Sequence, residues 1–169
     1  MRVVIVTVSD STFDGERRDT SGDTIRQWCE RRSDTLVAHL HVADESSQIS
    51  PVLAEWCDSG KVDLIVTTGG TGLAPRDVTP EATRAVIDRE AQGIAEFLRA
   101  SSFATFPRAA LSRGIAGIRG STLIVNLPGS TRGVHDGLST LLPIIDHAID
   151  IASGKVTRHD TPVTNQEIS

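Results

Sequence analysis

Three runs of aliphatic and β-branched residues constrain the fold of this chain more than any other feature. They are RVVIVTV at Arg2–Val8, KVDLIVTT at Lys61–Thr68 and STLIVN at Ser121–Asn126, and TLVAHLHV at Thr35–Val42 is a fourth expected strand. Runs that stay apolar at successive positions are typical of strands that are buried on both faces of a sheet. Such a sheet needs a layer of helices on each side.

Segments with helical periodicity separate these strands. The expected helices are Thr24–Arg32, Ile49–Cys57, Thr83–Arg89, Ile94–Arg99 and Val134–Ile151, the last interrupted at Pro143. Thr79 and Pro80 suit the N-cap and first turn of a helix, whereas the polar segment Ser9–Asp23 is expected to be a long loop. The alternation predicts an α/β fold with three layers and a doubly wound, mostly parallel sheet.

The 169 residues are enough for one domain with a substantial core. We expect a single domain over residues 1–154 and a flexible polar tail over residues 155–169. The net charge is −5 and no basic stripe carries interleaved aromatic residues, so we expect no nucleic-acid binding. We also expect a cytoplasmic protein with no membrane span or signal peptide, in which Cys29 and Cys57 are buried, reduced thiols.

The segment VTTGGTGLAPRDVTPEA leaves the third strand through three glycines within four residues. Glycine permits positive φ and lets the backbone approach a ligand closely. The loop is not a Walker loop, because no Lys-Ser/Thr pair follows, and its spacing is not that of a dinucleotide fingerprint. We interpret Gly69–Gly72 as an anion-binding loop in which a side chain at Gly70 would fill ligand space with little loss of stability. The alternative is a plain strand-to-helix turn.

Carboxylates follow two of the expected strands. Asp77 comes after the glycine loop, and Asp44 and Glu45 come directly after the second strand. Loops at the C-terminal ends of parallel strands converge at one edge of the sheet, and Mg²⁺ is often held by one or two carboxylates plus phosphate oxygens. These acids therefore predict a metal–phosphate site. The alternatives are a helix-capping role for Asp77 and solvated surface acids at the other two positions.

Three further features have open interpretations. NLPGS at Asn126–Ser130 is either part of a pocket or an ordinary Pro-Gly turn. Ser112 and Arg113 could bind a ligand or cap a helix. The five histidines show no metal-binding spacing, and His39 and His41, which alternate along the second strand, are interpreted as structural or surface residues.

Together these motifs resemble the molybdopterin adenylyltransferases, the MogA/MoaB-type proteins of molybdenum-cofactor biosynthesis, to which a domain of gephyrin is related. TTGGTG followed by RDVTPEAT carries the resemblance, and so does LSRGIAGIRGSTLIVNLPGS at Leu111–Ser130. SD after the first strand, DTSG at Asp19–Gly22 and ADE at Ala43–Glu45 fit weaker parts of the pattern. The resemblance extends from Val3 to about Ala152.

The resemblance implies a reaction in which the terminal phosphate of molybdopterin attacks the α-phosphate of ATP, with Mg²⁺ required, and releases pyrophosphate. It implies that Asp44 and Asp77 are the catalytic and metal-binding residues. The residues that it implies for substrate and nucleotide binding are Ser9, Gly69, Gly70, Thr71, Gly72, Ser112, Asn126, Pro128, Gly129 and Ser130. It further implies a homotrimer and a downstream partner, the molybdate-inserting enzyme.

One departure leaves the subfamily open. Thr131-Arg132 stands where the family often has Pro-Lys after NLPGS. An alternative function is therefore a MoaB-type paralogue that binds molybdopterin or its precursor without turnover, although the presence of both Asp44 and Asp77 favours the enzyme. A hydrolase or deamidase of the competence-damage type is disfavoured, because we would expect an additional domain.

Overall fold

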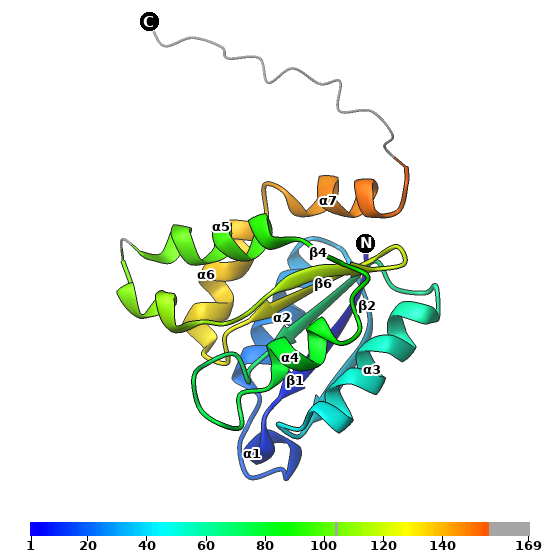
Figure 1. The fold of residues 1–169 in the computed structure, drawn as a ribbon. Coiled ribbons are helices and arrows are strands. Elements are labelled where there is room, and N and C mark those ends of the chain that lie inside the picture. Colours follow the sequence, from blue (N-terminus) through cyan, green and yellow to red (C-terminus); the bar gives the residue numbers. More distant parts are fainter. Residues whose placement is uncertain (104, 156–169) are drawn as a thin grey trace, which may run out of the picture.

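The computed structural model describes residues 1–103 and 105–155 and contains a sheet with helices on both faces (Figure 1). The strands are β1 Arg2–Val8, β2 Thr35–Val42, β3 Leu64–Thr68, β4 Arg89–Glu90, β5 Ala116–Arg119 and β6 Thr122–Leu127. The helices are α1 Asp10–Phe13, α2 Thr20–Arg31, α3 Ser46–Asp58, α4 Thr79–Arg84, α5 Gln92–Phe103, the 3-10 helix η1 Pro107–Leu111, α6 Thr131–Leu141 and α7 Ile145–Ala152.

The sheet has the strand order β2-β1-β3-β6-β5-β4. The first four of these strands are parallel, β5 runs antiparallel to β6, and β4 runs antiparallel to β5. The predicted α/β fold with a mostly parallel, doubly wound sheet is therefore confirmed. Local patterns did not indicate β4 and β5, because both are short and β5 contains Gly117, which lies against the side chain of Ile87.

Each central strand contributes to two hydrophobic cores. Val3 and Ile5 of β1 pack in one core with residues of α2, α6 and α7, whereas Val4, Val6 and Val8 pack in the other with residues of α3 and α4. All five side chains are at most 2% exposed. Complete burial of such a side chain stabilises the fold by roughly 1.5–3 kcal/mol, which explains why the strand sequences are continuously apolar.

The segment after β1 is more helical than expected. Residues 9–23 were expected to form a loop, but the structure has α1 there and starts α2 at Thr20, four residues before the expected start at Thr24. Asp19 is the N-cap of α2, and its Oδ1 accepts a hydrogen bond of 2.7 Å from the backbone N–H of Gly22. A capping side chain satisfies donors that the first helical turn leaves free, and so extends the helix into a polar sequence.

The two cysteines are buried free thiols, as predicted, and burial raises the pKa of each to about 11. Within the described ranges no helix is both long and apolar enough to cross a membrane. The expected flexible tail lies, apart from Lys155, outside the described residues.

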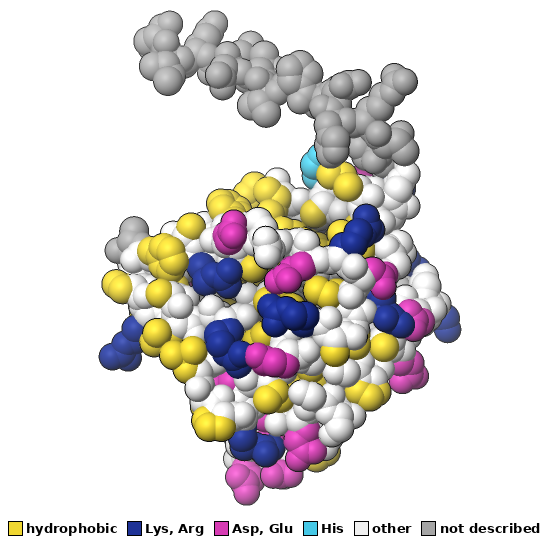
Figure 2. Space-filling view, viewed as in Figure 1, with side chains coloured by type: hydrophobic (Ala, Val, Ile, Leu, Met, Phe, Trp, Pro, Cys, Tyr) yellow, Lys and Arg dark blue, Asp and Glu magenta, His cyan; other side chains and the backbone are white. Residues whose placement is uncertain are grey.

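Large apolar side chains remain exposed at several places on the surface. Figure 2 shows apolar, acidic and basic side chains interspersed on the face in view. The exposed large apolar residues are Phe13, Leu73, Phe97, Phe103, Phe106, Leu111, Leu142 and Ile151. Single exposed apolar residues are normal on a monomer, but groups of them mark contact surfaces.

Candidate functional site

A cavity of about 430 Å³ lies beyond the C-terminal ends of β3 and β6. Most of the predicted site residues line it, namely Gly70, Thr71, Gly72, Asp77, Ser112, Asn126, Pro128, Gly129 and Ser130. Ser9, Asp44 and Gly69 are not among the lining residues. The cavity therefore lies at the C-terminal edge of the sheet, where the sequence predicted the site.

Two glycines turn the chain sharply after β3. Gly69 and Gly70 have φ angles of +98° and +61°, in the left-handed region that favours glycine. A Cβ at Gly69 would lie 2.1 Å from the carbonyl oxygen of Val8. The carbonyl oxygens of both glycines accept hydrogen bonds from Thr79, one from its hydroxyl at 2.9 Å and one from its backbone N–H at 3.1 Å. Thr79 is thus the first residue of α4 rather than its N-cap, because its hydroxyl is used to hold the loop.

The glycine loop lines the cavity and has free backbone donors. Among the described residues, no hydrogen bond is donated by the backbone N–H groups of Gly70, Thr71 or Gly72. The N-terminus of α6 begins beside them at Thr131, with Ser130 as its N-cap. Successive free N–H groups and a helix N-terminus both attract anions, so this end of the cavity suits a phosphate group.

The two predicted acids flank the glycine loop. A Cβ at Gly70 would lie 3.0 Å from Oδ1 of Asp44, and a Cβ at Gly72 would lie 2.8 Å from Oδ2 of Asp77. Burial raises the pKa of the Asp44 carboxyl, and the negative charges of Asp10 and Asp77 raise it further. Acids from separate loops are therefore close enough to repel one another, and a cation between them would relieve the repulsion.

Asp10 is a third acid of this group, which the sequence indicated only as part of the SD pair and not as a residue of the site. Its backbone N–H donates to Oδ2 of Asp44 at 3.0 Å, and the N–H of Asp44 donates to Oδ1 of Asp10 at 3.0 Å. Arg76 forms a two-pronged ion pair with the Asp10 carboxylate at 2.7 and 2.9 Å. The sequence signal that could have assigned Asp10 to the site is its position directly after β1, at the same edge of the sheet.

The donor set of this group fits Mg²⁺. Only carboxylate oxygens are offered, which hard divalent cations prefer. Arg76 already neutralises Asp10, whereas Asp44 has no ion-pair partner among the described residues. Asp77 accepts one hydrogen bond of 2.8 Å from the N–H of Ala74. Asp44 and Asp77 are therefore the two carboxylates of this group that could hold such an ion.

Arg113 joins the glycine loop to the acid that follows it. Its Nε donates to the carbonyl oxygen of Gly72 at 2.7 Å, and its two terminal nitrogens donate to the carbonyl oxygen of Asp77 and to the carboxylate of Glu81. Its backbone N–H donates to the carbonyl oxygen of Thr71 at 2.8 Å. All three guanidinium nitrogens thus donate to the glycine loop, to Asp77 and to Glu81, so Arg113 acts as a positioning residue for the loop.

The side chain of Asn126 also bonds inward. It is 3% exposed, its Nδ2 donates to Thr67 and Thr83 at 2.9 and 3.0 Å, and its Oδ1 accepts from the N–H of Ile115 at 3.2 Å. The polar groups of this side chain therefore tie neighbouring elements together beneath the cavity. Ser9, outside the lining, caps α1.

The opposite wall of the cavity is apolar, with arginines at its margin. Apolar lining comes from α5, from η1 and from the residue that precedes η1, through Ala95, Leu98, Phe106, Ala109 and Leu111. The charged lining residues are Arg99, Arg108, Arg132, Asp77 and Asp136. One cavity thus combines an apolar wall, free N–H donors and an excess of basic side chains, which suits a flat, anionic ligand.

Comparison with known families agrees with this arrangement. The family described as "Probable molybdopterin binding domain" matches residues 4–147. The chain belongs to this family. The match includes the glycine loop, all three acids and NLPGS, so the recognised resemblance is confirmed.

Named relatives of the family cover most of this chain. The molybdopterin adenylyltransferase of Helicobacter pylori (strain J99) is 38% identical over 91% of this chain and 89% of its own length. The Escherichia coli (strain K12) protein of the same name is 38% identical over 82% of this chain and 72% of its own. The molybdenum cofactor synthesis protein cinnamon of Drosophila melanogaster is 40% identical, but the chain spans 26% of its length.

Solved structures of the family share the fold. The molybdopterin biosynthesis enzyme MoaB from Thermus thermophilus is 49% identical, with a TM-score of 0.86 over 93% of this chain and 99% of that one. A MogA structure is 39% identical, with a TM-score of 0.85 over 90% and 99% of the two chains.

Proposed function

We propose that this chain is a molybdopterin adenylyltransferase of molybdenum-cofactor biosynthesis, which transfers the adenylyl group of ATP to the terminal phosphate of molybdopterin. The observation that carries the proposal is the position of Asp44 and Asp77 on either side of a glycine loop with free N–H donors. Five curated relatives that are 38% identical carry that name, which supports the assignment.

The cavity supports this choice of substrates. Its volume lies within the range of roughly 300–1,000 Å³ that is usual for small-molecule sites. A flat pterin or adenine ring would pack against the apolar wall that includes Leu98 and Phe106. The phosphates would then face the glycine loop and the arginines at the margin, including Arg132.

The residues of this chain supply positioning and charge neutralisation, which are the main requirements of phosphoryl-type transfer. The N–H groups of the glycine loop would hold a phosphate, and Arg113 keeps that loop in place. Asp44 and Asp77 would hold Mg²⁺, which when bound neutralises negative charge on the reacting phosphates. No covalent nucleophile of the chain is needed, because the molybdopterin phosphate is itself the attacking group.

A second candidate is a paralogue that binds molybdopterin without turnover, and the Thr131-Arg132 departure is the observation that favours it. The structure places Arg132 in the cavity lining, so a positive charge is retained there. The hydroxyl of Thr131 forms a hydrogen bond of 2.9 Å with that of Thr20.

We include in the main proposal a cytoplasmic homotrimer that supplies adenylylated product to the molybdate-inserting enzyme.

The test is single-turnover adenylylation with molybdopterin, ATP and Mg²⁺, with molybdopterin binding measured separately. Asp44→Asn and Asp77→Asn should each lower turnover on the order of a hundredfold or more, as expected when a strong electrostatic element is removed, and should affect binding less. Asp150→Asn on α7 is the matched control and should be as active as the wild type. Wild-type rates in both acid variants would contradict the metal-binding role, and equal losses of binding and turnover would favour the binding paralogue.

A further inference from the structure

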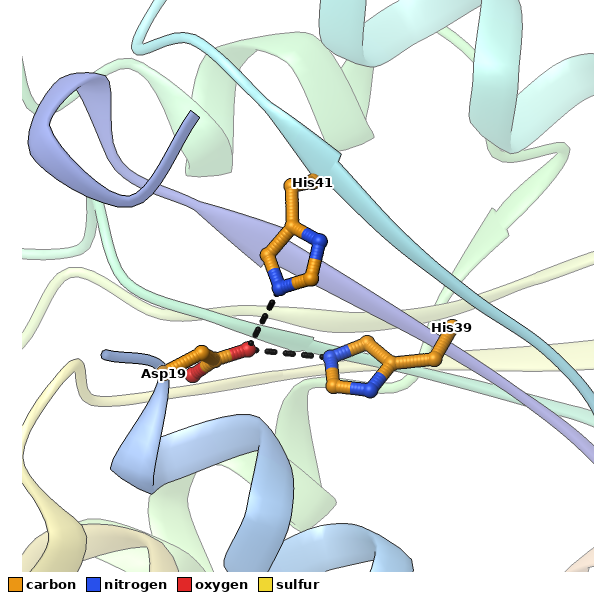
Figure 3. A group of neighbouring side chains, drawn as sticks. All are labelled: Asp19, His39 and His41. Atoms are coloured by element: carbon orange, nitrogen blue, oxygen red, sulfur yellow. Dashed lines mark hydrogen bonds and ion pairs between the residues drawn. The ribbon is translucent and has the colours of Figure 1, made fainter. Parts of the chain in front are cut away.

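A second group of potential metal ligands lies outside the cavity. Asp19 at the start of α2 and His39 and His41 of β2 point toward one another, as Figure 3 shows. The three ligand atoms lie within 4.8 Å of one another. Oδ2 of Asp19 is 2.9 Å from Nε2 of His39 and 3.0 Å from Nε2 of His41. None of the three residues lines the cavity.

We propose that Asp19, His39 and His41 bind a divalent transition-metal ion of the zinc class. Two imidazoles and one carboxylate form a mixed nitrogen and oxygen set, which suits Zn²⁺, Ni²⁺ or Cu²⁺ and is unlike the all-oxygen set that Mg²⁺ prefers. The site is thus chemically distinct from the acids beside the glycine loop.

The sheet register brings the two histidines onto one face. His39 pairs with Ile5 and His41 with Thr7, and residues two apart along a strand point to the same side. The ring centroids are 4.8 Å apart and the planes are inclined by 34°, so both Nε2 atoms reach the same carboxylate oxygen. Strand geometry therefore places the two histidines, which are separated by one residue, on the same face of β2.

The carboxylate of Asp19 is held in place before any ion binds. Its Oδ1 accepts hydrogen bonds from Ser21 Oγ at 2.9 Å and from the N–H of Gly22 at 2.7 Å, and the hydroxyl of Thr7 donates to Oδ2 at 2.5 Å. These contacts fix the orientation of the carboxylate, with Oδ2 facing the two histidines.

Gly22 has no side chain, and the cluster occupies the space that a side chain there would fill. A Cβ at this position would lie 2.3 Å from Oδ2 of Asp19 and 2.4 Å from Nε2 of His39. Glycine costs about 1 kcal/mol relative to alanine within a helix, yet any side chain here would displace the ligands. The site is also accessible, since the side chains of His39 and His41 are 18% and 40% exposed.

A metal ion would replace the hydrogen bonds that now join these groups. Because an ionised carboxylate can only accept, each Nε2 now carries the ring proton. Binding would move that proton to Nδ1, so that the Nε2 lone pair faces the ion. Tetrahedral zinc with bonds of about 2.0–2.1 Å separates its ligand atoms by about 3.3 Å, so each distance from Asp19 Oδ2 to a histidine Nε2 would need to lengthen by only a few tenths of an ångström. Water would complete the coordination.

The test uses the full, tag-free chain, stripped of metal, with ZnCl₂ as the probe and a chromophoric chelator as competitor. Wild-type protein should bind one equivalent of Zn²⁺, and an excess of Mg²⁺ should not displace it. The double substitution His39→Gln/His41→Gln retains N–H donors for Asp19 but removes the imidazole ligands. It should weaken zinc binding by about a hundredfold or more, because even the outer partners of metal ligands are worth 10–100-fold in affinity.

Two control variants isolate the site. Replacement of the remaining histidines, His135, His147 and His159, by Gln should leave zinc binding unchanged, and so should Asp44→Asn/Asp77→Asn. Circular dichroism checks folding, and if the double variant unfolds, the single His41→Gln variant of the more exposed ligand must show the loss. Absence of stoichiometric binding by the wild type, or undiminished binding by a folded His-to-Gln variant, would overturn the proposal.

Discussion

Asp44 is a carboxylate held where a neutral side chain would be more stable. It is partly buried, exchanges hydrogen bonds with Asp10 and lies near Asp77. Burial and these two negative neighbours raise the pKa of its carboxyl. Active sites often retain groups that reduce stability because the reaction requires them.

The raised pKa predicts a pH-dependent effect of Asp44→Asn on metal-free protein. Because the folded-state pKa exceeds the unfolded-state value, ionisation of Asp44 opposes folding above the folded-state pKa. The variant should therefore be at least as stable as the wild type at pH 7. Its advantage should disappear below about pH 4, where the carboxyl is protonated in both states. The measurement is urea denaturation over this pH range, and a variant that is less stable at pH 7 would contradict it.

At the scale of elements, the glycine loop combines a backbone requirement with a chemical one. The expectation that a side chain at Gly70 would cause little loss of stability was wrong, because its Cβ would lie 2.3 Å from Oγ1 of Thr79. The positive φ of Gly70 adds strain for any other residue. Gly72 differs, since its Cβ would meet only the carboxylate of Asp77, at 2.8 Å.

Alanine at these two positions should therefore have different effects. Gly70→Ala should lower the free energy of unfolding by about 1 kcal/mol or more, from the left-handed conformation and the contact with Thr79. Gly72→Ala should change stability less but reduce adenylylation by displacing Asp77. Chemical denaturation and single-turnover assays of both variants make the comparison. A fully active Gly72→Ala, or a Gly70→Ala as stable as the wild type, would show that the loop tolerates side chains.

At the scale of the whole molecule, the proposed trimer can be checked directly. The family resemblance implies it, and the exposed apolar side chains offer contact area that the single chain leaves uncovered. Sedimentation equilibrium at micromolar concentration should give a mass of about 54 kDa, three times the chain mass of 18.1 kDa. A single species at the chain mass would contradict the trimer and leave the fold and the site unaffected.

The sequence by itself determined the α/β class, the four long strands and the region of the candidate site. Burial on both faces produces an uninterrupted apolar run, which is a local pattern. The glycine loop and NLPGS follow such runs directly, so their positions at the C-terminal edge of the sheet follow from the topology. No such local pattern marks the short strands β4 and β5, because they form through pairing with their neighbours. The early start of α2 also lacks a local pattern, because it depends on the cap from Asp19.

Only the tertiary structure decided which side chains meet. Arg113 contacts the carbonyl oxygen of Gly72, which is 41 positions away in sequence, and His41 meets Asp19, which is 22 positions away. These contacts depend on strand register and on the docking of α2 against the sheet. The residue type at one position does not reveal strand register or helix docking, because both result from the packing of many side chains in the two cores.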